Sequence, residues 1–247
     1  MIKTVEIINA KKQALRGYLD LPDNYSGTLV VYFHGFTGNL TEHDGMFRNF
    51  SRFISEYGFA SLRCDFSGNG ESDGNFCDFT YDTLISDATV ILDYAKSINN
   101  ENIVLLGYSM GGAVAAYLAA QRPDEIERLL LWSPAGNLTD LIKMRYENAP
   151  KQVNGNIDCP NFELSKKMVE TLPKYNWHDG LEKYQNSVKI IHGRGDQAVN
   201  YLESYRYCGL FPHATVSIIA SAGHGYDRRG ERIQLYKKSL EFLRGRQ

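Results

Sequence analysis

The feature that most constrains this chain is a serine placed between a β-rich run and an alanine-rich helix. Residues 103–106 read Ile-Val-Leu-Leu, which favours a buried strand, and the Ala-rich run Met110–Gln121 favours a helix. The turn between them, residues 107–111, reads Gly-Tyr-Ser-Met-Gly and fits the pattern G-x-S-x-G. A residue in so sharp a turn has a strained backbone and an exposed side chain, and glycine is needed on both sides. The sequence therefore predicts that Ser109 is a nucleophile.

The rest of the chain alternates short β-rich runs with helical stretches. Strands are expected at residues 5–8, 14–21, 28–33, 59–64, 103–106, 129–132, 188–191 and 216–219, and helices at 46–57, 81–98, 110–121, 201–210 and 232–243. The nearly continuous apolar run at 28–33 is typical of a strand buried on both faces. This alternation predicts an α/β fold with a mostly parallel central sheet and helices on both faces.

Residues 133–187 break the alternation. The segment is longer than a crossover connection needs, and it contains Pro, Asn and Gly clusters with one predicted helix near residues 163–172. Its aromatic residues favour an ordered segment over a disordered loop. We predict a core of residues 1–132 and 188–247, with 133–187 inserted as a small cap over the active site.

Composition limits the class of protein and its partners. The chain has 247 residues, 43% of them hydrophobic, which suits a globular domain whose core needs no disulfides. The net charge of −2 lacks the positive surplus of a nucleic-acid-binding protein. No apolar run approaches the roughly 20 residues of a membrane span, and the first residues lack a signal-peptide core. The scattered cysteines form no CxxC pair, so we expect free thiols, no metal site and a cytoplasmic protein.

Serine is a weak nucleophile, and it needs a histidine base and an acid that orients this base. His224 follows the predicted strand 216–219 in the run Ser-Ala-Gly-His-Gly, and its flanking glycines let the ring reach the serine. Asp196 follows the predicted strand 188–191. The order Ser109, Asp196, His224 is the order expected for this type of site. The remaining histidines are predicted to be structural or exposed: His34, His43, His178, His192 and His213.

The oxyanion of an acyl-transfer reaction needs two backbone donors. One is predicted to be the N–H of Met110, directly after the nucleophile. The other is predicted to be the N–H of Phe36, in the loop His-Gly-Phe-Thr-Gly that follows the strand 28–33. A second glycine-rich loop, residues 65–74, lacks the lysine of a phosphate-binding loop, so we expect a structural role beside the active site.

These motifs resemble those of the α/β-hydrolase superfamily over nearly the whole chain. The run His-Gly-Phe-Thr-Gly-Asn at 34–39, the loop 65–74, and Pro134-Ala135 followed by Asp140 resemble the bacterial cinnamoyl (feruloyl) esterases. The resemblance implies hydrolysis of small-molecule esters of hydroxycinnamic acids without a cofactor or metal, and it suggests a homodimer. It also implies that Asp140 holds the phenolic hydroxyl. The tyrosine of that family falls near Ser165, so the candidate substitutes are Tyr146, Tyr175 and Trp177.

Other functions remain open at this stage. A monoacylglycerol or lysophospholipid lipase, or a thioesterase, would use the same three residues with a different acyl pocket. A noncatalytic ligand-binding protein is a further alternative, because a fold does not fix a function. The presence of a serine, an aspartate and a histidine in the expected order favours an enzyme.

Overall fold

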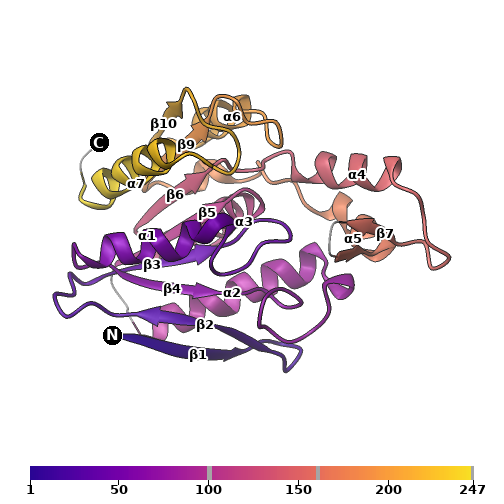
Figure 1. Cartoon of the computed structure of the whole chain (residues 1–247), viewed down its shortest axis with the longest axis horizontal. Helices are drawn as coiled ribbons and strands as arrows, with labels where there is room; N and C mark the ends of the chain where they lie inside the picture. Colours follow the sequence, from indigo (N-terminus) through magenta and orange to yellow (C-terminus); the bar gives the residue numbers. More distant parts are fainter. Residues whose placement is uncertain (99–101, 160–161, 246–247) are drawn as a thin grey trace.

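A central sheet of eight strands dominates the computed structural model, which describes residues 1–98, 102–159 and 162–245 (Figure 1). The strand order is β1-β2-β4-β3-β5-β6-β9-β10. The bounds are β1 (Ile2–Ile8), β2 (Ala14–Asp20), β3 (Thr28–Phe33), β4 (Ala60–Cys64), β5 (Asn102–Tyr108), β6 (Arg128–Trp132), β9 (Ser187–Gly193) and β10 (Ala214–Ile219). β2 is antiparallel to both of its neighbours, and the other pairs are parallel. The predicted mostly parallel sheet is confirmed.

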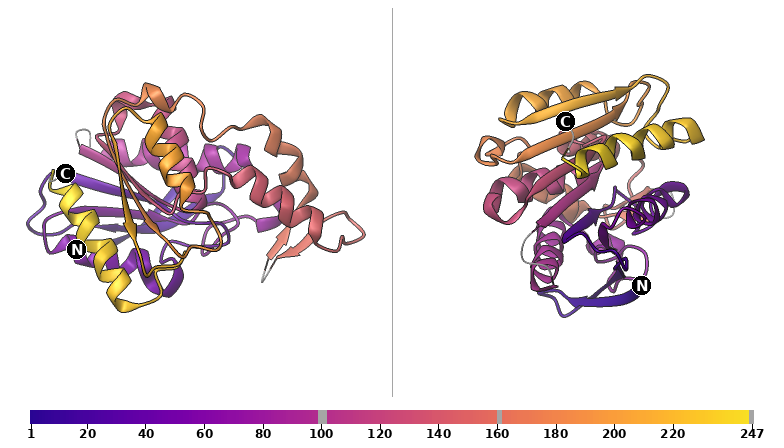
Figure 2. Two further views of the ribbon diagram at one scale, coloured as in Figure 1. Left: turned by 90° about the horizontal axis from the view of Figure 1, so that it is seen from above. Right: turned by 90° about the vertical axis from the view of Figure 1, so that its left-hand side faces the viewer.

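Helices cover both faces of this sheet, as predicted (Figure 2, right). One face carries α1 (Met46–Ser55) and α7 (Arg229–Leu243), and the other carries α2 (Tyr81–Ile98), α3 (Met110–Gln121) and α6 (Leu202–Leu210). Each face of the sheet has its own hydrophobic core. Successive residues of β3 pack into opposite cores, since Val30 packs on the α1 side and Val31 on the α3 side. This double burial explains why the run at 28–33 is apolar almost throughout.

The segment 133–187 is organised differently from the single helix predicted near residues 163–172. It contains α4 (Leu138–Asn148), the hairpin of β7 (Ile157–Cys159) and β8 (Phe162–Leu164), and the short helix α5 (Lys166–Thr171). The helix predicted near residues 163–172 was wrong at residues 163 and 164, which belong to β8 and pair with β7, and α4 was not predicted at all. In Figure 1 these elements lie together beyond the tips of the parallel strands. The division into a core and a cap stays a prediction.

Two further observations concern membrane-spanning helices and the cysteines. In the part of the chain that the structure describes, no helix has both the length and the apolar character needed to cross a membrane. Cys64, Cys77, Cys159 and Cys208 are free cysteines.

We expect Phe50→Ala to lower the free energy of unfolding by about 3–5 kcal/mol, the usual loss for a buried phenylalanine. The Phe50 ring is fully buried between α1 and the sheet, with its centroid 4.9 Å from that of Trp132 and 5.1 Å from that of Tyr236. Urea unfolding measures the change. The control is Phe53→Ala, three residues along the same helix and only partly buried, which should lose less. Equal losses would contradict this account of the core.

Candidate active site

Ser109 occupies a strained turn between β5 and α3. Its backbone has φ 54° and ψ −116°, a conformation that L-residues rarely adopt. A Cβ atom on Gly107 would lie 2.2 Å from the carbonyl oxygen of Gly111, and one on Gly111 would lie 2.0 Å from the carbonyl oxygen of Phe33. Both positions therefore exclude any side chain, which is the physical reason for the two glycines of the motif.

The three residues predicted as nucleophile, base and acid lie in one hydrogen-bonded chain. His224 Nε2 is 3.0 Å from Ser109 Oγ, and His224 Nδ1 is 2.6 Å from Asp196 Oδ2. Asp196 follows β9 and His224 follows β10, so the ends of three parallel strands bring them together. The Asp196 side chain has no exposed surface, whereas that of His224 is 23% exposed. The geometry suits proton transfer from the serine hydroxyl to the imidazole.

Asp196 is surrounded by donors. Burial alone would raise the pKa of Asp196, but hydrogen bonds from His192 and His224, the positive charge of His224 and a backbone N–H from Val199 hold this pKa well below its ordinary value. The backbone N–H groups of Ala198 and Val199 each lie 2.8 Å from Oδ1. The carboxylate therefore stays ionised at neutral pH.

Tyrosine hydroxyls hold the loop that carries His224. The hydroxyl of Tyr108 donates to the carbonyl oxygen of His224 at 3.1 Å. The hydroxyl of buried Tyr226 donates to the carbonyl oxygen of Ile191 at 3.0 Å and lies 2.8 Å from Ser133 Oγ. These contacts fix the imidazole between Ser109 and Asp196.

The two predicted oxyanion donors flank Ser109 and are free to bind. A Cβ atom on Gly35 would lie 3.4 Å from Ser109 Cβ, so the loop before Phe36 passes directly over the nucleophile. Among the described residues, none accepts a hydrogen bond from the backbone N–H of Phe36 or Met110. Met110 is also the first residue of α3, where the N–H has no partner within the helix.

Two buried side chains shape the loop that contains Phe36. Glu42 accepts hydrogen bonds from the backbone N–H groups of Gly35 and His43. His34 Nδ1 donates to the carbonyl oxygen of Gly35 at 2.9 Å, while its Nε2 accepts from the N–H of Phe66 at 3.0 Å. Burial lowers the pKa of His34 to about 4, so the ring is neutral and links this loop to the glycine-rich loop after β4.

Two cavities meet at Ser109 and His224. The larger, about 660 Å³, is mainly apolar, and the smaller, about 360 Å³, is mainly polar. One face of α4 lines the larger cavity with Leu138, Leu141, Ile142, Met144, Arg145 and Asn148. The smaller cavity is lined by polar groups that include Thr37, Asn39, Glu42 and His43. Ser109 therefore borders one apolar cavity and one polar cavity.

The predicted substrate-binding residues Asp140 and Tyr146 lie on α4 but line neither cavity. The Asp140 side chain is exposed, and the Tyr146 hydroxyl donates to the carbonyl oxygen of Gly155 at 2.6 Å. Other residues of α4 line the larger cavity instead, among them Leu141, Ile142 and Arg145. The sequence did contain a signal for the residues that line the cavity, because residues 138, 141, 142 and 145 have the spacing of one side of a helix.

The predicted candidates Tyr175 and Trp177 also lie away from both cavities. The Tyr175 hydroxyl donates to Asp82 Oδ1 at 2.6 Å. The Trp177 ring is buried and packs edge-on against Tyr81, with 4.9 Å between the ring centroids. Both aromatic side chains therefore attach the segment 133–187 to α2.

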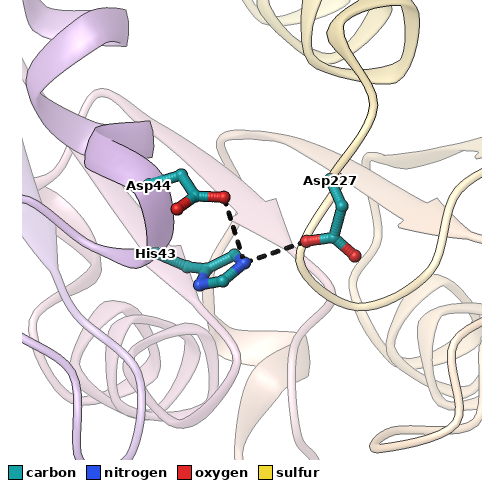
Figure 3. A group of neighbouring side chains, drawn as sticks. All are labelled: His43, Asp44 and Asp227. Atoms are coloured by element: carbon teal, nitrogen blue, oxygen red, sulfur yellow. Dashed lines mark hydrogen bonds and ion pairs between the residues drawn. The ribbon is translucent and has the colours of Figure 1, made fainter.

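His43, Asp44 and Asp227 form an exposed polar cluster (Figure 3), and His43 also lines the smaller cavity. His43 Nε2 is 3.0 Å from Asp227 Oδ1 and 3.4 Å from Asp44 Oδ2. Within the described ranges, the ligand atoms of these three side chains lie close enough together to hold a metal ion. The His43–Asp227 contact joins the loop before α1 to the loop after His224.

Comparison with known proteins gives a consistent picture. A family model described as "Serine aminopeptidase, S33" matches residues 26–170. The solved structure of Est1E from Butyrivibrio proteoclasticus with ferulic acid bound superposes with a TM-score of 0.80 at 27% identity, covering 96% of this chain and 98% of that one. Mouse alpha/beta hydrolase domain-containing protein 10 has a TM-score of 0.78 at 17% identity, with 98% and 99% covered, which shows the fold alone.

The curated relatives match only part of their length. A multifunctional-autoprocessing repeats-in-toxin protein of Vibrio cholerae is 33% identical over 157 residues, which are 60% of this chain and 3% of the toxin. Putative esterase/lipase 3 of Mycoplasma pneumoniae is 32% identical over 164 residues, which are 66% of this chain and 57% of that protein. The chain thus spans less than two thirds of these relatives.

We expect Glu42→Gln to change how stability depends on pH. Burial raises the pKa of Glu42 to about 7 from an ordinary value of 4.5. The folded state therefore retains a proton that the unfolded state loses, and Glu42 stabilises the fold less as pH rises from about 4.5 through 7. Glutamine does not titrate, so the free energy of unfolding of the variant should rise relative to wild type between pH 5 and pH 8.

Urea unfolding at both pH values measures this difference. The control is Glu56→Gln, which changes an exposed glutamate at the end of α1 and should show no such trend. A constant difference between Glu42→Gln and wild type at the two pH values would contradict the prediction.

Proposed function

Because the chain belongs to the serine aminopeptidase S33 family and has the α/β-hydrolase fold, we propose that it is an esterase that acts through an acyl-enzyme on Ser109. The observation that carries the proposal is the hydrogen-bonded chain from Ser109 through His224 to Asp196. Two free backbone donors beside Ser109 supply the rest of the required machinery.

The proposed reaction has two halves. Ser109 Oγ attacks the ester carbonyl carbon while His224 Nε2 takes the hydroxyl proton, and the N–H groups of Phe36 and Met110 bind the oxyanion. His224 then gives the proton to the departing alcohol. A water molecule, deprotonated by His224, attacks the acyl-enzyme and regenerates Ser109. Asp196 stays ionised throughout and stabilises the imidazolium.

For the acyl group we propose a hydroxycinnamoyl-type acid in the larger cavity. The cavity combines an apolar wall with polar groups on α4, which suits an aromatic acid with a polar ring substituent. The Arg145 guanidinium carbon lies 5.9 Å from the centre of the Phe36 ring. We assign Arg145 and Asn148, both of which line the cavity, to the polar end of the acyl group. The similarity to a structure with bound ferulic acid supports this choice.

The alcohol would then occupy the smaller cavity. Asn39, Glu42 and His43 offer hydrogen-bonding groups there. A leaving alcohol with several hydroxyl groups, such as a sugar or glycerol, matches that lining. The segment 133–187 would serve as the cap, since α4 forms one wall of the larger cavity.

A lipase acting on monoacylglycerols is the second candidate, because the larger cavity is apolar and one relative is described as a putative esterase/lipase. A thioesterase would use the same chemistry. Comparing kcat/KM for methyl ferulate, a medium-chain monoacylglycerol and an acyl thioester separates these three substrate classes.

We expect Ser109→Ala to lower kcat/KM for p-nitrophenyl butyrate by at least about 10³-fold, because no other group can form the acyl-enzyme. A fluorophosphonate probe should label wild type and leave the variant unlabelled. The control is Ser221→Ala, which changes an exposed serine near His224 and should keep full activity. An equally active Ser109→Ala variant would refute the assignment, and a wild type without labelling or turnover would favour a noncatalytic binding protein.

We expect Leu141→Trp to lower kcat/KM for methyl ferulate by about 10-fold while leaving p-nitrophenyl acetate hydrolysis nearly unchanged. Leu141 is half-buried on the cavity face of α4, so the larger ring would occupy acyl space without disturbing the core. The matched control is Lys143→Trp, which adds the same ring to the exposed face of the helix. Similar losses for both esters, or for both variants, would contradict the proposed acyl pocket.

A further inference from the structure

A second histidine binds the carboxylate of the triad, and we propose that His192, oriented by Ser204, is a positioning residue that sets the pH range in which the triad works. This inference rests on the proposed function of Ser109, His224 and Asp196. The sequence analysis placed His192 among the histidines predicted to be structural or exposed.

The evidence begins with the two oxygens of Asp196. Oδ1 accepts the backbone N–H groups of Ala198 and Val199. Oδ2 lies 2.6 Å from His224 Nδ1 and 3.0 Å from His192 Nε2. The side chains of His192 and Asp196 have no exposed surface, so water does not screen the contact between them. Two imidazoles therefore share one carboxylate oxygen.

The surroundings of His192 determine where its proton lies. Nε2 faces two acceptors, Asp196 Oδ2 and the carbonyl oxygen of Val199 at 3.1 Å, so Nε2 must carry a hydrogen. Nδ1 lies 2.6 Å from the hydroxyl of Ser204, a fully buried residue of α6. A hydroxyl that donates to Nδ1 leaves the ring neutral and directs its one proton to Asp196. Ser204 thus selects the tautomer that binds the triad.

The shared oxygen gives His192 an influence on His224. A hydrogen bond from His192 draws negative charge away from His224, because both donors compete for the same lone-pair density on Oδ2. His192 therefore weakens the stabilisation that Asp196 gives to the imidazolium of His224. Removing His192 should shift the acid limb of the pH–rate profile to higher pH.

Other titratable groups near the triad have to be separated from this effect. Glu203 on α6 pairs with His178 at 3.2 Å, and Tyr226 and Tyr108 approach from the loop after β10 and from β5. Burial raises the pKa of both tyrosines, so neither ionises near neutral pH. Glu42 titrates in the relevant range, since burial raises its pKa to about 7. The variants are therefore compared in both wild-type and Glu42→Gln backgrounds.

The first test uses two changes of His192. His192→Phe removes both ring nitrogens and keeps an aromatic ring, so the acid limb of kcat/KM for p-nitrophenyl butyrate should rise by about half a pH unit or more. We expect kcat to fall by about 10-fold and KM to change little. His192→Gln retains an N–H donor and should restore much of the wild-type profile. An unchanged acid limb in a folded His192→Phe variant would overturn the proposal.

The second test compares two buried serines and remains decisive if His192→Phe does not fold. Ser204→Ala removes the hydroxyl that faces Nδ1, whereas Ser239→Ala removes an equally buried hydroxyl that pairs with Trp132 Nε1 on the other face of the sheet. Both should destabilise the fold, but only Ser204→Ala should move the acid limb. The same shift in both variants, or in neither, would show that the contact is purely structural.

A measurement without turnover separates this proposal from the proposed function. Side-chain NMR of ¹⁵N-labelled histidines reports the His192 tautomer and the titration midpoint of His224 even in Ser109→Ala. We expect a protonated Nε2 on His192 at pH 7 and a higher His224 midpoint in Ser204→Ala. A protonated Nδ1 with a bare Nε2 would refute the positioning role, whereas absent ester hydrolysis alone would refute only the proposed function.

Discussion

The close approach of β3, β5 and α3 at Ser109 is the constraint on which the site depends. The carbonyl oxygen of Phe33 touches the position that a side chain on Gly111 would need, so β3 and α3 are in backbone contact there. The N–H of Ser109 is also bound to the carbonyl oxygen of Trp132 at 2.9 Å, which ties the turn to β6. The strained conformation of Ser109 persists because its neighbours on three elements leave no alternative.

The parts of the site that the sequence predicted are those tied to strand ends. Asp196 and His224 are far from Ser109 along the chain, yet the carboxyl ends of parallel strands meet at one edge of a sheet, so their order and placement indicated a common location. The fold class followed from the same alternation of strands and helices. Both inferences use local sequence patterns. The parallel sheet then places the ends of its strands side by side, so residues far apart in the sequence come close together.

The lining of the larger cavity beside Ser109 was not predictable in this way. The apolar face of α4 both packs on the core and lines the cavity, and polar residues such as Arg145 interrupt its apolar pattern. Tyr175 and Trp177 were predicted for their aromatic side chains, but both pack against Tyr81, which buries Trp177 and partly buries Tyr175. The hydrogen bond between His192 and Asp196 depends on the conformation of the turn after β9. No sequence pattern in that turn predicts this conformation.

Two buried carboxyl groups, Asp196 and Glu42, lie near His224, and the number of donors around each decides its charge. Asp196 receives four N–H donors, two from histidines, and stays ionised where a negative charge stabilises an imidazolium. Glu42 receives two backbone donors, and burial raises its pKa to about 7, so much of it is neutral at neutral pH. A full negative charge at Glu42, beside the loop that carries Phe36, would repel an oxyanion bound there. In the proposed mechanism, full negative charge therefore lies on the histidine side of Ser109, and less negative charge lies on the side of the proposed oxyanion donors.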